Sequence, residues 1–291
     1  MDTTRLKIAH KDIEKIFNEH SLNIFKRTDI EKIIKENWDF LRLATGTTTL
    51  GFIKYLLQNT ILNEHKFKFP SRTEIRYSWG EQSLYKIIET IRPNSYFTHY
   101  TALYFHNLTE QIPKTIYLNY EQAKKRTINR ELEQGRIQSA FQRKVRQSSN
   151  IAEIQDYRVC LLNGKFTDQL SVIELSGDYG YDIRTTSIER TLIDCTVRPV
   201  YAGGVHEVLN GYRLAQGKVS INKLVSILKK IDYIYPYYQA IGFYLERAGN
   251  YSESAINLLR NFDFNYDFYL THDMKEREYS REWRLYYPKG F

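Results

Sequence analysis

The chain has 291 residues, 42% of them hydrophobic, which is enough for two domains with ordinary cores. Its formal net charge is +8 at pH 7, so we expect an acidic partner, with nucleic acid ahead of an anionic membrane surface. The two cysteines, Cys160 and Cys195, are too few for a disulfide framework or a cysteine-rich zinc site.

Targeting and membrane signals are missing from the sequence. The start MDTTRLKIAHKDIEKIF has no apolar stretch and no twin arginine, so it does not resemble a secretory signal. No run of about 18 apolar residues is present that could span a bilayer. We therefore expect a cytoplasmic protein without a membrane partner.

Residues 1–80 are predicted to form a winged helix-turn-helix domain. Helical periodicity places a first helix around Ile13–Phe17, a second from a Thr28 cap to Leu43, and a third that opens at Thr47. The third helix has its predicted apolar stripe at Leu50, Ile53 and Leu57. The period then changes to two in the segments KFKF (66–69) and EIRYSW (74–79), which predicts a hairpin with one apolar and one mostly basic face.

This order of elements suggests how the domain would hold DNA. In a winged helix the third helix enters the major groove and the hairpin follows the backbone or the minor groove. A helix N-terminus and its hydroxyls suit phosphate or base edges, and hairpin cations neutralise phosphates. The candidate DNA-binding residues are Thr47, Thr48, Thr49, Lys54, Lys66, Lys68, Arg72 and Arg76. The alternative is that the threonines only cap the helix and the cations only solubilise the domain. We favour DNA contact because the basic residues are expected to share one hairpin face.

Residues 81–291 are predicted to form a larger mixed domain with a small β-sheet and a helical subdomain, so the whole chain belongs to the α+β class. A helix ends before Pro93, and a second helix runs into a strand over 95–118. Three further strands over 156–164, 169–177 and 181–187 are expected to join the strand at 112–118 in one sheet. Helices follow from Ser220, over 237–249 and from Ser252, and strands close the chain over 262–270 and 280–291.

A basic segment lies inside this second region. Residues 121–146 contain eight Lys and Arg against three Glu. Its cations form a second candidate basic surface: Lys124, Lys125, Arg126, Arg130, Arg136, Arg143, Lys144 and Arg146. Like charges at helical spacing repel one another without a counterpart, so we expect an anionic partner there, whether flanking DNA, an RNA or an acidic protein face.

The stretch TTSIERTLIDCTVRPVYAGGVHEVLNGY (185–212) predicts two helices joined at a Pro and Gly-Gly break. Thr186 can cap the first helix with Glu189 completing a capping box, and Arg190 and Asp194 can pair four residues apart. These charged residues look more like contacts that define the fold than like a catalytic set.

Two stretches together resemble the AbiEi-type antitoxins of bacterial type IV toxin–antitoxin (abortive infection) systems. The first resembles a family helix and strand through Ala102, Leu103, His106, Leu108, Thr109 and Pro113. The second resembles the family motif through Thr186, Ser187, Glu189, Arg190, Leu192, Asp194, Gly203 and Gly204. A terminal Arg281-x-Trp283-x-Leu285 is similar as well. Asn107 replaces a usual glycine, and the hairpin at Arg72–Tyr77 lacks the glycine of many family wings.

The resemblance implies an antitoxin that represses its own operon through the first domain, with two copies on inverted repeats of double-stranded operator DNA. It implies that residues 81–291 neutralise a nucleotidyltransferase-like toxin, by direct contact or indirectly. A stand-alone winged-helix regulator with a ligand-sensing or dimerising second domain is the first alternative. A nucleic-acid-processing enzyme with acidic residues such as Asp178 and Asp182 is the second.

Motifs of catalysis are missing. The sequence has no GxxxxGK[ST] loop, no GxGxxG after a strand and no GxSxG elbow. His206-Glu207 begins like a zinc-binding HExxH, but Asn210 stands where the second histidine belongs. The Gly-Ser dipeptide of the accompanying toxins is also missing. We therefore expect no enzyme activity, no cofactor and no metal.

Overall fold

The computed structural model describes residues 4–124, 131–176 and 182–291. The chain divides into two compact units, both of mixed α and β structure. The first unit comprises Met1–Pro93 with Ile151–Asp156, and the second comprises Asn94–Asn150 with Tyr157–Phe291. The first unit extends past residue 80 because the Arg76 guanidinium donates hydrogen bonds to the carbonyls of Thr90 and Ile91.

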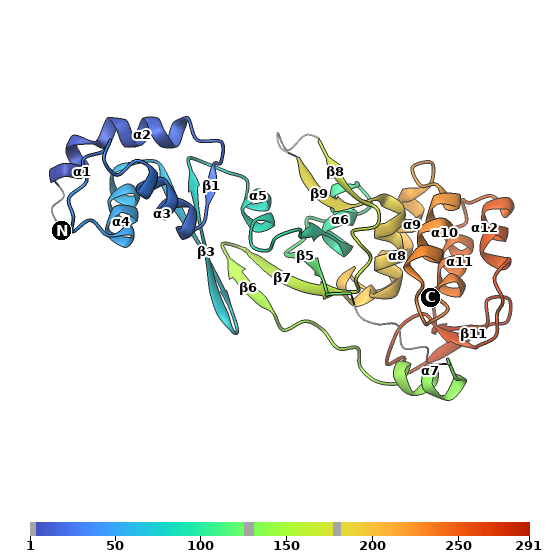
Figure 1. Ribbon diagram of the computed structural model, residues 1–291. Coiled ribbons are helices and arrows are strands. Elements are labelled where there is room, and N and C mark those ends of the chain that lie inside the picture. The colour runs from blue at the N-terminus through green and yellow to red at the C-terminus, as the bar shows by residue number, and fades with distance from the viewer. Residues whose placement is uncertain (1–3, 125–130, 177–181) are drawn as a thin grey trace. The chain divides into compact units, whose positions relative to one another are not determined.

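In the first unit, helices precede and surround a small antiparallel sheet (Figure 1). In chain order its elements are α1 (Thr4–Ile8), α2 (His10–Asn18), β1 (Ile24–Phe25), α3 (Arg27–Glu36), α4 (Thr49–Asn59), β2 (Leu62–Phe69), β3 (Arg72–Trp79) and α5 (Leu84–Glu89). The strand order is β1-β3-β2. The short strand β6 (Ile151–Ile154) also belongs to this unit, where it contacts β2.

The core of the first unit joins its helices to the base of the hairpin. Phe17 from α2 stacks on Trp79 from β3 with ring centroids 4.8 Å apart. The Trp79 indole Nε1 donates to Asn18 Oδ1 at 2.6 Å, which satisfies its polar group while the ring stays buried. Ile30 from α3 and Leu56 from α4 are fully buried in the same cluster. Apolar burial therefore fixes the three helices against the sheet.

Several details of the predicted helices are wrong. Helix α3 begins at Arg27 after Lys26 instead of being capped by Thr28, and α4 begins at Thr49 instead of Thr47. The second helix ends at Glu36 instead of Leu43, because the Asn37 side chain turns back and donates to the Ile33 carbonyl. The following Phe40 is 64% exposed. In α4, Leu50 is 58% exposed and does not belong to the apolar stripe. Phe52 and Leu56, four residues apart, form the buried face instead.

The second unit contains a sheet with the strand order β7-β5-β4-β9-β8, of which β5, β7, β8 and β9 are labelled in Figure 1. Its strands are β4 (Tyr96–Phe97), β5 (Thr115–Glu121), β7 (Tyr157–Gly164), β8 (Val172–Leu175) and β9 (Ile183–Thr186). Strand β5 runs parallel to β7, and β4 runs parallel to β9. The prediction that these segments join one sheet is confirmed. Helix α6 (His99–Phe105) connects β4 to β5.

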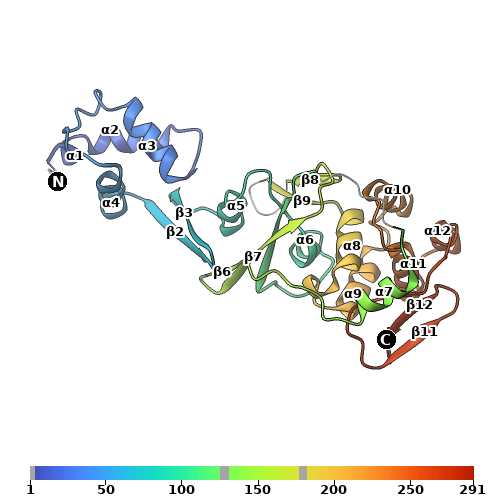
Figure 2. The same ribbon diagram turned by 60° about the horizontal axis from the view of Figure 1, so that its bottom comes forward.

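A helical layer and a small second sheet complete this unit (Figure 2). The helices are α7 (Gln134–Phe141), α8 (Ile188–Val197), η1 (Pro199–Tyr201), α9 (Val205–Ala215), α10 (Ile221–Ile231), α11 (Tyr237–Ala248) and α12 (Glu253–Arg260). The second sheet has the order β10-β12-β11, from β10 (Phe268–Tyr269), β11 (Arg277–Ser280) and β12 (Leu285–Pro288). The helical layer and this sheet are closely packed. A Cβ atom added to Gly242 of α11 would lie 2.0 Å from the ring of Trp283, which lies between β11 and β12.

The predicted helix ends in this unit are largely confirmed. Ser220 and Ser252 accept hydrogen bonds from backbone N–H groups as N-caps, and Gly249 ends α11 with φ of 76°. The predicted strands near the C-terminus are too long. Only Phe268–Tyr269 pairs within 262–270, and the last strand begins at Leu285. Alternating aromatics there fill the helical core instead of lining a sheet face.

Candidate nucleic-acid interface

Helix α4 presents its N-terminus and one polar face to solvent. The helix begins at Thr49, and Thr48 is its N-cap, with Oγ1 accepting from Gly51 N at 3.1 Å. Thr47 and Thr49 are half-buried and Thr48 is exposed, so this end of the helix lies near solvent, with the Gly51 N–H already bonded to the Thr48 cap. Lys54 is exposed on the outer face, as expected.

The hairpin cations do not share one face, which corrects the prediction. In the observed register Lys66 pairs with Ile75 and Lys68 with Thr73, whereas Arg76 pairs with His65. Directly paired residues in an antiparallel sheet lie on the same face, so the two lysines and the two arginines lie on opposite faces. Alternation within each strand could not reveal this, because the pairing register depends on where the chain turns.

The two arginines of the hairpin are engaged inside the first unit. Arg76 is only 4% exposed and donates to the Thr90 and Ile91 carbonyls. Arg72 is half-buried and donates to Glu74 Oε1 at 2.7 Å. The Arg76 guanidinium is not free for a phosphate in this arrangement, and the Arg72 guanidinium is already paired with Glu74, so both are withdrawn from the candidate interface. Lys66 forms an ion pair with Glu64.

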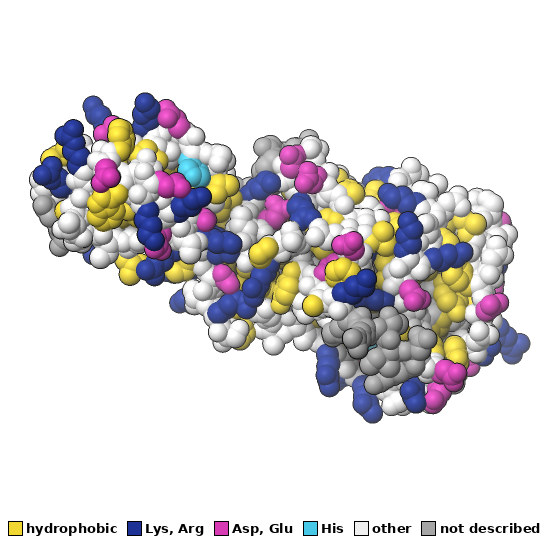
Figure 3. All heavy atoms as spheres, viewed as in Figure 1, with side chains coloured by type: hydrophobic (Ala, Val, Ile, Leu, Met, Phe, Trp, Pro, Cys, Tyr) yellow, Lys and Arg dark blue, Asp and Glu magenta, His cyan; other side chains and the backbone are white. Residues whose placement is uncertain are grey.

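Lys54 and Lys68 are the cations of the predicted DNA-binding set that remain exposed and unpaired, as judged within the described part of the first unit. Figure 3 shows Lys and Arg side chains of the N-terminal unit interspersed with acidic ones on the face in view. The candidate interface therefore contains fewer residues than the sequence predicted. It consists of Thr47, Thr48, Thr49, Lys54 and Lys68.

Sequence reasoning missed Leu50 and Gln58, which lie four residues before and after Lys54 on α4. Both are exposed, so the three side chains form an outward row along the helix. The sequence could have indicated that Leu50 faces outward, because Phe52 and Leu56 form a more apolar inward face than one that includes Leu50. Arg42 was missed too; it is exposed in the loop before α4 and has φ of 49°.

The second basic surface is described only in part, because Lys125, Arg126 and Arg130 lie outside the described residues. Arg136 forms an exposed ion pair with Glu133, and Arg143 donates to Ser139 Oγ. Lys124, Lys144 and Arg146 are exposed. The described cations thus lie partly on α7 and partly in the segments on either side of it.

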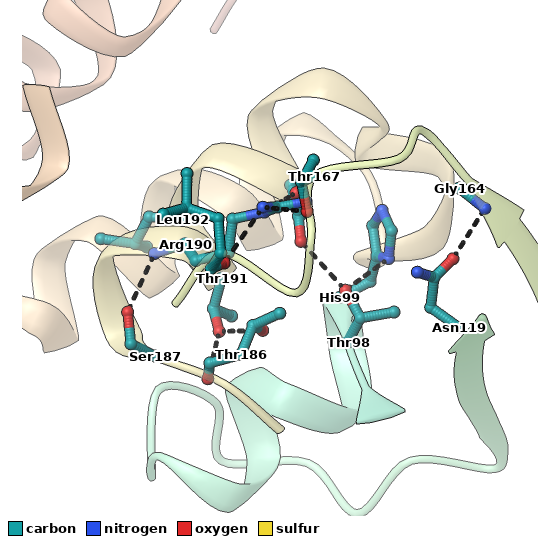
Figure 4. Close-up of polar contacts among 12 residues, drawn as sticks. Thr98, His99, Asn119, Gly164, Thr167, Thr186, Ser187, Arg190, Thr191 and Leu192 are labelled. Atoms are coloured by element: carbon teal, nitrogen blue, oxygen red, sulfur yellow. Dashed lines mark hydrogen bonds and ion pairs between the residues drawn. The ribbon is translucent and has the colours of Figure 1, made fainter. Parts of the chain in front are cut away.

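The charged residues of the 185–212 motif are buried and bonded to one another, as expected. Arg190 Nε donates to Asp194 Oδ1 at 2.8 Å, and their side chains are only 6% and 9% exposed. Thr98, the residue before α6, donates to Asp194 Oδ2, and Arg190 also donates to the Leu170 carbonyl. Arg190 donates as well to Thr167 Oγ1, and both residues are labelled in Figure 4. Asp194 raises the pKa of Arg190 even though burial opposes its charge, so the guanidinium stays protonated.

The N-cap of α8 is Ser187, which corrects the prediction of Thr186. Ser187 Oγ accepts from Arg190 N, and it donates to the Glu189 carboxylate. Thr186 ends β9, and its hydroxyl meets that of Thr191 at 2.7 Å. Burial opposes the charge of Glu189, but hydrogen bonds from Lys223, Ser187 and the Ser220 backbone lower its pKa.

Several other residues of the two family-like stretches also have structural roles. Gly203 and Gly204 have φ of 79° and 95°, so they form the redirecting turn that was predicted. His106 Nε2 lies 2.6 Å from the Thr186 carbonyl, which joins the two family-like stretches. Asn107 has φ of 54°, a left-handed backbone that asparagine tolerates where the family has glycine.

Among residues 4–124, 131–176 and 182–291, no group of three or more His, Cys, Asp and Glu is placed to hold a metal ion. Burial raises the pKa of both the Cys160 and the Cys195 thiols, so neither is an activated nucleophile. Asp182 contacts Ser176, and Asp178 lies outside the described residues.

No model of a known protein family matches the chain, and no curated protein matches it in sequence. Among solved structures, it is similar to the crystal structure of the Rv2827c protein from Mycobacterium tuberculosis. The two share 12% sequence identity with a TM-score of 0.61, over 97% of this chain and 91% of that one. At this identity the likeness is one of fold. No helix within the described residues is long and apolar enough to cross a membrane.

The buried pair in α8 yields a stability prediction. Replacing Asp194 by Ala leaves the Arg190 guanidinium buried without its carboxylate, which should lower the free energy of unfolding by about 3–5 kcal/mol. Glu276→Ala removes the partner of Lys289 in a pair whose side chains are 72% and 66% exposed. That control should cost about 0–1 kcal/mol. Urea denaturation followed by circular dichroism measures both, and equal losses would contradict the structural role assigned to the pair.

Proposed function

We propose that the chain binds duplex DNA through its first unit, as a winged helix-turn-helix repressor. The observation that carries this proposal is the order α2-β1-α3-α4-β2-β3 with sheet order β1-β3-β2. In such a domain α4 is the recognition helix and the β2–β3 hairpin is the wing. The exposed N-terminus and outer face of α4 support this role.

Contacts would divide between base edges and phosphates. Lys54 and Gln58 on the outer face of α4 can reach base edges in the major groove, and Leu50 can pack against a thymine methyl. Backbone N–H groups near Thr48 suit a phosphate, since the helix dipole is positive at this end. Lys68 lies two residues from the hairpin turn and would neutralise a backbone phosphate.

We further propose that the chain is an antitoxin of the AbiEi type, in which the second unit antagonises a nucleotidyltransferase-like toxin. The resemblance over Ala102–Pro113 and Thr185–Tyr212 supports this part of the proposal. Because Arg190, Asp194 and Glu189 are buried, any surface that meets a toxin must be formed by other residues. Repression by two copies on inverted repeats follows from the symmetry of palindromic operators.

Removing the two free cations of the interface should weaken DNA binding in a salt-dependent way. Lys54→Ala with Lys68→Ala should reduce the slope of log K against log salt by about one for each lost phosphate contact. The probe is a duplex covering the promoter upstream of the gene, in gel shifts at several salt concentrations. Lys11→Ala with Lys15→Ala on α2 removes the same charge from exposed positions outside the interface. Identical slopes for the two double variants would overturn the assignment.

The antitoxin role is tested by co-expression with the product of the neighbouring gene, scored by growth. Wild-type protein should restore growth. The Lys54→Ala, Lys68→Ala variant should restore it equally when expressed from a foreign promoter, because its second unit is unchanged. Failure of the wild-type protein to rescue would remove the antitoxin proposal and leave the DNA-binding proposal standing.

A further inference from the structure

A cavity of about 980 Å³ opens in the second unit where two parallel strands end. Strands β5 and β7 have their carboxyl ends at the same edge, with Glu121 paired to Gly164. Lys124 and Lys165, which follow these strands, line the cavity together with residues of α6, α8 and the end of α10. Open sheets with parallel strands bind ligands at this edge.

The cavity wall is cationic. Five Lys and Arg line it against two Asp. Two of the cations are satisfied internally, since Arg190 pairs with Asp194, and Lys165 Nζ donates to the carbonyls of Ile231 and Asp232 at 2.6 and 2.7 Å.

The other three cations of the wall are Lys124, Arg146 and Arg198. All three residues are exposed, and none of their side chains forms a hydrogen bond or ion pair within the described residues. They come from three separate segments, so folding gathers like charges around one opening. Repulsion among them is relieved by a bound anion, and guanidinium groups favour phosphate because they can donate two parallel hydrogen bonds.

Aromatic and apolar side chains line the same space. Phe166 and Tyr233 contribute half-buried rings, and Lys165 Nζ lies 5.5 Å from the centre of the Tyr233 ring. Tyr201 is only 8% exposed and packs edge-on against His99, whereas Ile234 is 65% exposed although it is a large hydrophobic residue. Aromatic faces of this kind stack with nucleobases. The volume lies within the range of pockets for drug-sized ligands, about 300–1,000 Å³, so a lone phosphate would leave most of it unfilled.

Two residues of the wall have a left-handed backbone conformation. His99 and Asp232 both line the cavity with φ of 52°, a left-handed conformation that is rare for residues with side chains. The His99 ring is held by the Thr98 hydroxyl, 3.1 Å from Nδ1, and Thr98 is in turn bonded to Asp194 (Figure 4). Burial lowers the pKa of His99 to about 4, so the imidazole is neutral at pH 7. The His99 side chain therefore adds no charge to the inner wall.

We propose that this cavity binds a nucleotide, with its phosphates at Lys124, Arg146 and Arg198 and its base against the aromatic side chains. The nucleotide is either free or the phosphorylated end of a nucleic-acid strand, since both offer the same chemistry. This inference does not depend on DNA binding by the first unit. It gives the second unit the capacity to sense a phosphorylated ligand.

Isothermal titration calorimetry of the full chain tests the proposal. The probes are ATP, GTP, CTP and UTP, together with tripolyphosphate as a ligand without a base and a 5′-phosphorylated tetraribonucleotide. We expect at least one base-containing probe to bind with a Kd below about 100 μM, and tripolyphosphate to bind at least about tenfold more weakly. A tetranucleotide at least about tenfold tighter than every free nucleotide identifies a strand end as the source, and the reverse order identifies a free nucleotide.

A charge-matched pair of variants locates the site. Arg146→Ala with Arg198→Ala should weaken binding by about tenfold or more, because two charge-assisted contacts are lost. Arg213→Ala with Arg281→Ala removes the same charge from exposed residues that neither line the cavity nor belong to the second basic surface, and should leave the Kd unchanged. Both pairs lie on the surface, so thermal unfolding should match wild type. The proposal is overturned if no base-containing probe binds with a Kd below about 100 μM, if tripolyphosphate binds within about tenfold of the best base-containing probe, or if both pairs weaken binding alike.

Discussion

A buried guanidinium needs acceptors on every side, and in the second unit Arg190 finds them on separate elements. Its partners are Asp194 on the same helix, Thr167, and the Leu170 carbonyl. The Glu121 carboxylate at the end of β5 accepts from both the Thr167 backbone N–H and its hydroxyl. Burial opposes ionisation of Glu121, but these hydrogen bonds hold its pKa below the ordinary value. One network therefore joins α8, the loop over 167–170 and the sheet.

The same network forms a wall of the cavity. Asp194 and Arg190 line it, and Thr98 links Asp194 to the strained His99. The motif that resembles the antitoxin family thus has a structural role in this molecule, and its position also decides where a ligand can be held. The surfaces proposed to bind DNA belong to the other unit, on α4 and the hairpin. We infer that the two units have separate binding roles.

The spacing of residues along the chain correctly predicted features that depend only on nearby residues in the sequence. Arg190 and Asp194 lie four residues apart and pair, Gly203 and Gly204 turn the backbone, and Ser220 and Ser252 cap helices. Features that depend on residues far apart in the sequence could not be predicted from this spacing. The hairpin register moved Arg72 and Arg76 to the face opposite the lysines. The cavity brings together residues from Tyr96 to Ile234, and no sequence spacing encodes that assembly.

Hydrogen–deuterium exchange of the full chain, with and without a duplex of its own promoter region, measures directly where DNA is held. Amides at a DNA-bound helix N-terminus and hairpin turn exchange more slowly because the duplex covers them. Our account predicts slowed exchange in peptides covering residues 47–58 and 66–72, and unchanged exchange in α8. Protection confined to the second unit, or none anywhere under conditions where the duplex binds, would contradict it.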